Sequence, residues 1–347
     1  MHKNTLSFRS WINQILTVGF SVFVVCFALW LCLALWYQHP LNTVITVTLM
    51  VFSAGLSATI LVLYWQQRWL ARQNIVYAYL IFLGICLTWY FSIQPQQDRE
   101  WDPEVAQQLH YTRQGDEIQL HNVRNFIWHD QNHYTERWET RRFKLSEIQG
   151  VNIITSYWMG PQIAHTLVSF DIQNHAPLTF SIEIRKEKNE AFSALGGFFR
   201  KYELSLIAAD EKDIIYTRSH IRGEQVYFFP TQISKPMAQQ LFLEYLAKAD
   251  RLQQSPQWYN TLTSNCTTLV FDMMQVVSNQ RLPLDYRLLA SGYLPNYMHD
   301  LHALPYNWDM KTWYQRAHIN AKMPKRQAIS SPAYSALIRQ GLIENNQ

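Results

Sequence analysis

Three long apolar runs occupy the first 93 residues of the chain and then end abruptly. They cover residues 15–37, 41–65 and 75–93, and each is close to the roughly 20 apolar residues that a helix needs to cross a bilayer. A polar stretch, residues 94–100, follows the third run. The first run lacks a small-residue cleavage site, which favours a retained helix over a cleaved signal peptide. The pattern therefore predicts a three-helix membrane anchor over residues 1–95 rather than a buried soluble bundle.

Shorter periodic segments follow the anchor. Segments with alternating or β-branched apolar residues, bounded by polar turns, predict antiparallel strands joined by hairpins. They are residues 117–120, 125–128, 134–143, 151–157, 165–172 and 178–185. Farther along, apolar residues recur at helical spacing in residues 235–252 and 266–277. We therefore expect an α+β domain, divided into a linker and entry segment (96–120), a main domain (121–300) and a C-terminal extension (301–347).

The charges of the anchor are all positive. Up to residue 97 the chain has no acidic residue and four basic ones, Lys3, Arg9, Arg68 and Arg72. They equal the formal net charge of +4, so the rest holds 26 basic and 26 acidic residues. Lys3 and Arg9 precede the first run, and Arg68 and Arg72 lie in the connection between the second and third runs. The positive-inside rule assigns both of these segments to the cytoplasm. We expect a multi-pass protein of the bacterial inner (cytoplasmic) membrane, with a cytoplasmic N-terminus and a periplasmic C-terminal domain. This charge-balanced domain is not expected to bind nucleic acid.

Cys266 is the only cysteine outside the apolar runs. The other three, Cys26, Cys32 and Cys86, lie inside them. Cys266 therefore has no partner for a disulfide within the monomer. It is a small buried hydrophobe, one side of an intermolecular bridge or a reactive thiol.

Cys266 also stands where a helix should begin. One apolar stripe at helical spacing contains Cys266, Leu269, Val270, Met273, Met274 and Val277, so we expect the thiol to face the sheet. Ser264 and Asn265 are favoured N-cap residues. In a first turn, the helix dipole and the free N–H groups would lower the pKa of the thiol and could bind a developing oxyanion. Simple packing fits these facts equally well, because free cysteine is among the most buried residue types.

His165 is the best candidate for the base that a cysteine nucleophile needs. It opens the strand 165–172, which a turn near residue 174 returns as residues 178–185. A hairpin centred there places His165 opposite Glu183, and a centre one residue later would place Arg185 there instead. A carboxylate would fix the imidazole tautomer and stabilise its charged form. A structural histidine is the alternative interpretation.

No other pattern points to a metal ion or a cofactor. HExxH, paired CxxC, GxSxG, P-loop and dinucleotide-binding fingerprints do not occur, so we expect neither group. The acidic stretch 210–213, followed by Arg218 and Arg222, predicts a solvated surface more readily than the wall of a polar site.

Several short strings give the exported part a resemblance to a known family. They are residues 164–166, 169–170, 181–185, 198–203, 259–263 and 265–268, of which Asn-Cys-Thr-Thr at 265–268 is the most specific. From residue 122 to residue 297 the chain resembles the family catalogued as domain of unknown function 4105, which is associated with Lnb-type lipoprotein N-acyltransferases. That family is similar to the permuted papain-like (NlpC-type) superfamily, in which the histidine strand precedes the cysteine helix, as His165 precedes Cys266 here.

The resemblance implies a fold, a reaction and partners. The fold would be a permuted papain-like domain with an antiparallel sheet and a Cys-bearing helix. Cys266 would take an acyl chain from a phospholipid as a thioester and pass it to the α-amino group of a lipoprotein, with His165 as base and Glu183 as orienting group. Supporting or substrate-contacting candidates are Asn265, Tyr259, Arg185, Ser169 and Thr267. The apolar residues from Phe192 to Phe199 would contact an acyl chain or form a core helix.

Two other functions fit the same residues. NlpC-type folds use a Cys–His pair on peptide bonds, so a cell-wall amidase or endopeptidase is one alternative. A non-catalytic membrane-anchored module, in which Cys266 only packs, is the other. Nothing in the sequence indicates an oligomeric state.

Overall fold

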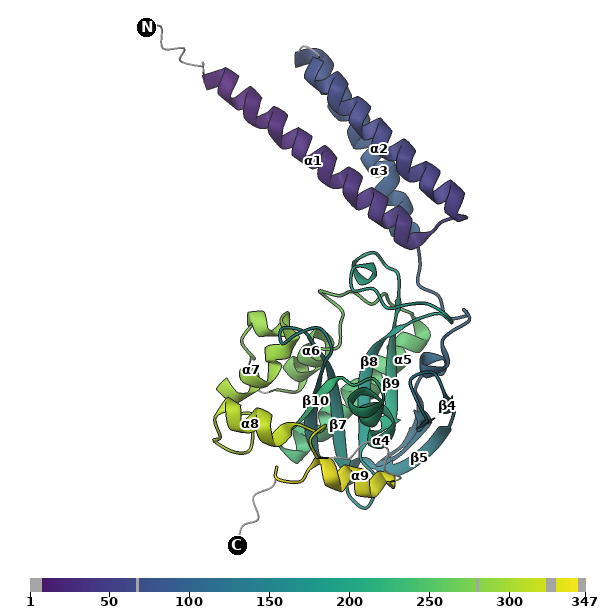
Figure 1. The fold of residues 1–347 in the computed structure, drawn as a ribbon, viewed down its shortest axis with the longest axis vertical. Coiled ribbons are helices and arrows are strands. Elements are labelled where there is room, and N and C mark those ends of the chain that lie inside the picture. Colours follow the sequence, from purple (N-terminus) through teal and green to yellow (C-terminus); the bar gives the residue numbers. More distant parts are fainter. Residues whose placement is uncertain (1–7, 67–68, 279–280, 323–328, 343–347) are drawn as a thin grey trace. The chain divides into compact units, whose positions relative to one another are not determined.

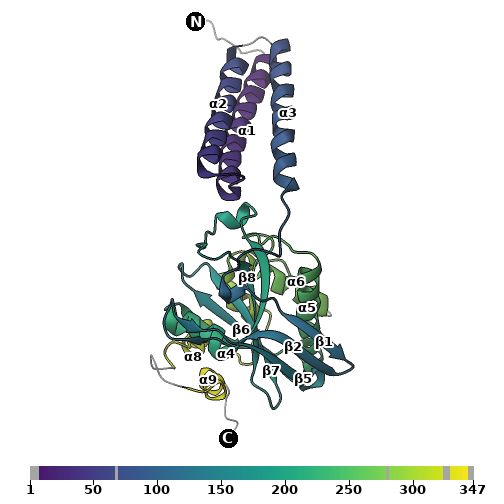
Figure 2. The same ribbon diagram turned by 90° about the vertical axis from the view of Figure 1, so that its right-hand side faces the viewer.

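Helices form one unit of the chain, and a sheet covered by helices forms the other (Figures 1 and 2). The computed structural model describes residues 8–66, 69–278, 281–322 and 329–342. The first unit contains residues 1–95 and 195–201, and the second contains residues 96–194 and 202–347.

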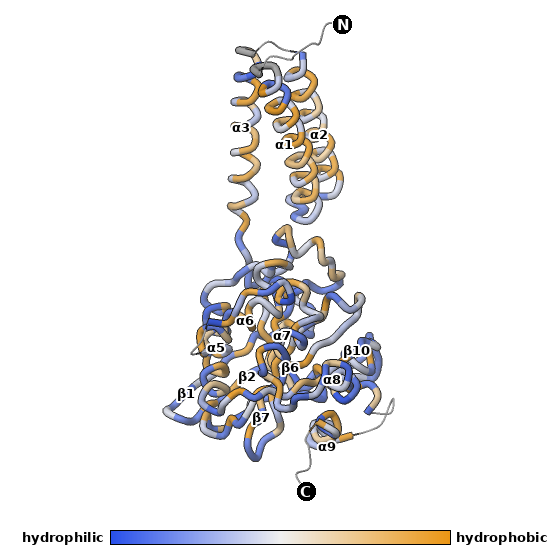
Figure 3. The backbone as a smooth tube through the Cα atoms, turned by 90° about the vertical axis from the view of Figure 1, so that its left-hand side faces the viewer, coloured by the Kyte–Doolittle hydropathy of each residue, from blue (hydrophilic) through white to orange (hydrophobic). Residues whose placement is uncertain are grey.

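The first unit contains α1 (Phe8–Gln38), α2 (Thr43–Gln66) and α3 (Trp69–Ser92). Within the described residues, these three helices are long and apolar enough to cross a membrane (Figure 3), which confirms the three apolar helices predicted from the sequence. Many of their large apolar side chains are exposed, including Leu29 and Phe52, as expected for helices that face lipid. Lys3 and Arg68, on which the predicted orientation partly depends, lie outside the described residues.

One mixed sheet organises the second unit. Its strands are β1 (His110–Gln114), β2 (Glu117–Arg124), β5 (Trp138–Lys144), β6 (Ile148–Tyr157), β7 (Ala164–Ile172), β8 (Leu178–Arg185), β9 (Glu203–Asp210) and β10 (Gln225–Pro230). Their order is β1-β2-β9-β8-β7-β6-β10, and β5 also pairs with β2. A separate hairpin consists of β3 (Ile127–Trp128) and β4 (Tyr134–Thr135). This confirms an α+β fold.

The expectation of a purely antiparallel sheet is wrong at one pairing. Strands β2 and β9 are parallel, at Arg124 and Ala209, whereas the other pairings are antiparallel. A hairpin pattern reveals the direction only of strands that follow each other in the chain, and β2 and β9 come from distant segments. The single strand predicted over residues 134–143 is interrupted between β4 and β5.

Helices cover both faces of the sheet. On one face, α5 (Lys235–Gln254) packs against the aromatic side chains of the central strands, and the rings of Phe170 and Phe242 lie 5.2 Å apart. Successive side chains of a strand point to opposite faces. Ser169 therefore points to the other face, where it contacts α4 (Glu211–Tyr216).

The C-terminal part of the chain belongs to the same core. Its helices are α7 (Leu294–Asp300), α8 (Met310–Ala317) and α9 (Ser331–Ile338). Trp313 and Tyr334 are fully buried and share one apolar cluster with the sheet. The described part of residues 301–347, expected as an extension, therefore packs on the domain. Likewise, residues 96–120, expected as a linker and entry segment, contain β1 and the start of β2.

Candidate active site

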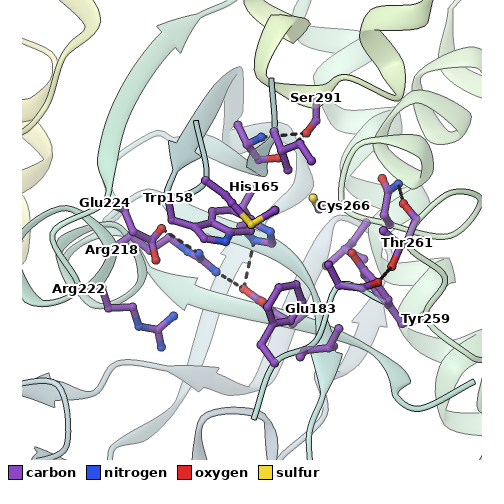
Figure 4. A pocket seen from close by; sticks show the side chains of 18 of the residues that line it. Trp158, His165, Glu183, Arg218, Arg222, Glu224, Tyr259, Thr261, Cys266 and Ser291 are labelled. Atoms are coloured by element: carbon purple, nitrogen blue, oxygen red, sulfur yellow. Dashed lines mark hydrogen bonds and ion pairs between the residues drawn. The ribbon is translucent and has the colours of Figure 1, made fainter. Parts of the chain in front are cut away.

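A cavity of about 400 Å³ opens where β7, β8 and the turn before α6 (Thr268–Val277) come together. Cys266, His165 and Glu183, the three residues predicted to act in catalysis, all line it (Figure 4). The structure thus brings together two strand residues and a thiol that lie far apart in the sequence.

The side chain of Asn265 shapes the turn that carries Cys266. Its Oδ1 accepts the N–H groups of Thr267 and Thr268 at 2.8 and 2.9 Å, and its Nδ2 donates to the carbonyl of Thr261 at 2.8 Å. The helix α6 begins at Thr268, and Cys266 lies in the turn before it. The predicted start of the helix at Cys266 is therefore wrong by two residues, and the N–H groups of Thr267 and Thr268 are occupied by the Asn265 side chain.

The turn is docked on the beginning of β7. The Sγ of Cys266 accepts the N–H of Thr166 at 3.5 Å, and the hydroxyls of Thr267 and Thr166 hydrogen bond at 2.9 Å. Cys266 is buried, with 7% of its surface exposed. These contacts fix the thiol beside the residue that precedes Thr166, which is His165.

The hairpin of β7 and β8 has the register that the sequence predicted. Leu167 pairs with Ser181 and Phe170 with Leu178, and the Nε2 of His165 lies 3.2 Å from the Oε1 of Glu183. Continued by two residues, this register places Glu183, and not Arg185, opposite His165.

A chain of hydrogen bonds holds the imidazole. The Nε2 of His165 lies 2.7 Å from the hydroxyl of Ser181, which donates to the Oε1 of Glu183 at 2.6 Å. Arg218 donates from Nη2 to the same carboxylate oxygen at 2.7 Å and from Nη1 to Glu224 at 3.3 Å. Because Nε2 is engaged in this way, Nδ1 is the ring nitrogen left for the thiol of Cys266.

Burial and charge act in opposite directions on the pKa values of this group. Burial and the charge of Arg218 lower the pKa of His165, but Glu183 and Cys266 outweigh them and raise it to about 9. Burial raises the pKa of Cys266, but the charge and hydrogen bond of His165 and the N–H of Thr166 lower it below its usual value. Burial raises the pKa of Glu183, yet His165 and Arg218 hold it well below its usual value. These directions favour a thiolate, an imidazolium and a carboxylate side by side.

Two of the supporting candidates lie elsewhere. Arg185 donates to the carbonyl oxygens of Val105 and Ala106 and stacks on Trp101. It is therefore a structural residue, and its assignment as the fallback orienting group is wrong because of the hairpin register.

Ser169 donates to Glu211 at 2.5 Å and does not line the cavity. It lies four residues beyond His165, which is roughly 13 Å along an extended strand. It therefore contacts α4 instead of a substrate in the cavity. Tyr259 and Asn265 do line the cavity, whereas Thr267 supports the turn through Thr166.

For the charged segment around residue 218, the less favoured of the two interpretations is the one that fits the structure. Arg218 and Arg222 line the cavity, as the polar-wall alternative predicted, and the favoured solvated surface is wrong for Arg218, which is buried. That interpretation is also wrong for Asp213, which is buried and accepts from Arg124 at 2.8 Å. The contact of Ser181 could have been predicted from the sequence, because Ser181 stands two residues before Glu183 and its side chain therefore lies on the same face of β8. In the part of the chain that the structure describes, no three His, Cys, Asp or Glu side chains are grouped to hold a metal ion.

Comparison with known families identifies the segment that forms this site. Residues 134–292 match the Lnb N-terminal periplasmic domain. This segment contains His165, Glu183 and Cys266, and the match supports the Lnb-type family for it. Together with the three apolar helices, the Lnb-type match fits a membrane-associated protein with a periplasmic C-terminal part. No curated protein and no solved structure matches the chain.

Proposed function

We propose that this protein is a membrane-anchored thiol acyltransferase. It would move an acyl chain from a phospholipid to the α-amino group of the N-terminal cysteine of a lipoprotein, through a thioester on Cys266 and without a cofactor. The observation that carries this proposal is the pairing of Cys266 with His165, which Glu183 orients, in an open cavity. Such an arrangement is the general requirement for an activated cysteine nucleophile.

In the first half-reaction, the thiolate of Cys266 attacks the carbonyl carbon of the donor ester. A C–S bond forms, the C–O bond breaks, and the imidazolium of His165 gives its proton to the departing alkoxide, so the donor leaves as a lysolipid. Within the described residues, the N–H of Cys266 makes no hydrogen bond. It is therefore available to stabilise the developing oxyanion.

In the second half-reaction, the α-amino group of the acceptor attacks the thioester carbonyl. His165, now neutral, takes a proton from the attacking nitrogen, a C–N bond forms and the C–S bond breaks. The thiolate of Cys266 and the imidazolium of His165 are thereby restored.

The membrane topology of the protein and its fold superfamily are part of the same proposal. The four basic residues of the anchor segment support a multi-pass topology with a cytoplasmic N-terminus and a periplasmic domain. The order of His165 before Cys266, on a strand and on the turn before a helix, supports a relationship to the permuted papain-like superfamily.

The test replaces the proposed nucleophile in the full-length protein. We expect Cys266→Ser to abolish acylation of the lipoprotein amino terminus, measured by mass spectrometry of the N-terminal peptide. Cys26→Ser, which changes a thiol in α1, is the matched control and should retain acylation. Unchanged acylation in Cys266→Ser would contradict the proposal, and Cys266-dependent release of cell-wall peptides would replace it by the amidase function.

A further inference from the structure

Large apolar side chains gather at the mouth of the cavity, beside the exposed and charged Arg222, and its floor is polar. Five large apolar side chains line the cavity and are still between 41% and 58% exposed: Trp158, Met159, Ile163, Phe192 and Leu289. We call these five residues the apolar mouth. They come from the β6–β7 loop, the segment after β8 and the segment before α7, and the rings of Trp158 and Phe192 lie edge to face at 6.4 Å.

The apolar mouth is a set of unburied side chains and does not belong to the core. The core helix considered for residues 192–199 is wrong, because that stretch contains only a short 3₁₀ turn, Gly196–Phe198. Single apolar side chains on a surface are normal, but several gathered around one cavity mark a binding site for an apolar ligand or a membrane. The cavity is also within the size range of small-ligand sites, about 300–1,000 Å³.

The composition of the mouth favours an acyl chain over a peptide. A bound peptide carries N–H and C=O groups that need partners along its length, whereas none of the five side chains is charged. A fatty acyl chain needs such partners only at its ester, which would lie beside Cys266 and His165 on the floor. The domain that contains the cavity begins at Gln96, three residues after the last apolar run ends at Ile93.

We propose that the apolar mouth is the binding site for the fatty acyl chain of the lipid donor and makes the enzyme selective for long-chain donors. This inference rests on the proposed function, because the bound chain must present its ester to Cys266. Binding along the mouth places the donor carbonyl at the thiol, whereas a short acyl group gains no such contact.

The test compares two donors that differ only in chain length. Full-length protein in detergent micelles is mixed with nitrophenyl acetate or nitrophenyl palmitate, and the nitrophenolate burst reports acylation of Cys266. We expect Trp158→Ser and Phe192→Ser to lower kcat/KM for the palmitate at least tenfold and for the acetate less than twofold. Leu284→Ser is the matched control, because Leu284 is 81% exposed and does not line the cavity. It should change neither value.

The outcomes separate this inference from the proposed function. If Trp158→Ser and Phe192→Ser keep kcat/KM for the palmitate within twofold of the wild-type value, the apolar mouth is not an acyl site. An equal loss of kcat/KM for both donors in a folded variant would overturn it as well. A burst that persists in Cys266→Ser would overturn the proposed function itself. The midpoint of thermal unfolding reports whether each variant is folded, and Phe192→Leu, with a smaller expected loss for the palmitate, replaces Phe192→Ser if that variant unfolds.

Discussion

The chemistry assigned to this site depends on the charges of two buried side chains, Cys266 and His165. The reactive form in the proposed mechanism contains a protonated His165, whose pKa of about 9 predicts the alkaline limit of the proposed activity. Because Glu183 raises this pKa, removing its charge should lower it. The pH profile therefore reports directly on the contact between His165 and Glu183.

We expect Glu183→Gln to shift the alkaline limb of the profile to lower pH and to slow thioester formation at neutral pH, roughly 100-fold. On the alkaline side of the profile, the wild-type rate of thioester formation should fall as the pH rises through about 9, where His165 loses its proton. The measurement is the nitrophenyl acetate burst as a function of pH. Glu244→Gln, which changes a carboxylate on α5, is the control and should leave the limb in place. An alkaline limb that Glu183→Gln does not move would contradict the role of Glu183.

At the residue scale, the sequence predicts side-chain contacts within one hairpin but not contacts between distant segments. Glu183 follows from a hairpin whose two strands are adjacent in the chain, so the register could be read from one turn. Arg218 reaches the same carboxylate from a segment beyond β9, and its burial depends on tertiary packing. The charge pattern around it, taken alone, resembles a solvated surface.

At the scale of secondary-structure elements, the thiol is positioned by the cap that the Asn265 side chain forms over the N–H groups of Thr267 and Thr268, at the turn before α6. We expect Asn265→Ala to lower the free energy of unfolding by about 1 kcal/mol, because the N–H groups of Thr267 and Thr268 lose their acceptor. The burst rate should fall as well, since the turn that carries Cys266 loosens. Chemical denaturation followed by tryptophan fluorescence measures the first effect.

The control for this change is Asn265→Asp, which keeps an oxygen acceptor at the cap and should retain most of the stability. An Asn265→Ala variant as stable and as fast as the wild type would show that the cap does not hold the turn.

The sequence missed β9 for a physical reason. All eight residues of β9 are buried, so the strand lacks the alternation of apolar and polar residues by which half-buried strands are recognised. The strands of the β7–β8 hairpin were predictable because polar turn residues bound them. The start of α6 was predicted at Cys266, two residues before its observed start at Thr268.

At the scale of the whole molecule, the anchor is the part that the sequence predicts best. A membrane span is defined by the length of one apolar run, which is a local property. The packing of the domain depends instead on residues that are distant in the sequence. Strand β2 pairs in parallel with β9, and Trp313 and Tyr334, near the C-terminus, are buried in the core. The Lnb-type match covers residues 134–292, which include Cys266, His165 and Glu183, the proposed nucleophile, base and orienting carboxylate.

The thioester intermediate is the most direct test of this account. Full-length protein is incubated with phospholipid vesicles without an acceptor, and the peptide that contains Cys266 is analysed by mass spectrometry. We predict the added mass of one acyl chain on Cys266, removed by neutral hydroxylamine and lost to the acceptor when lipoprotein is supplied. Acylation of the lipoprotein while Cys266 stays unmodified throughout turnover would contradict the account.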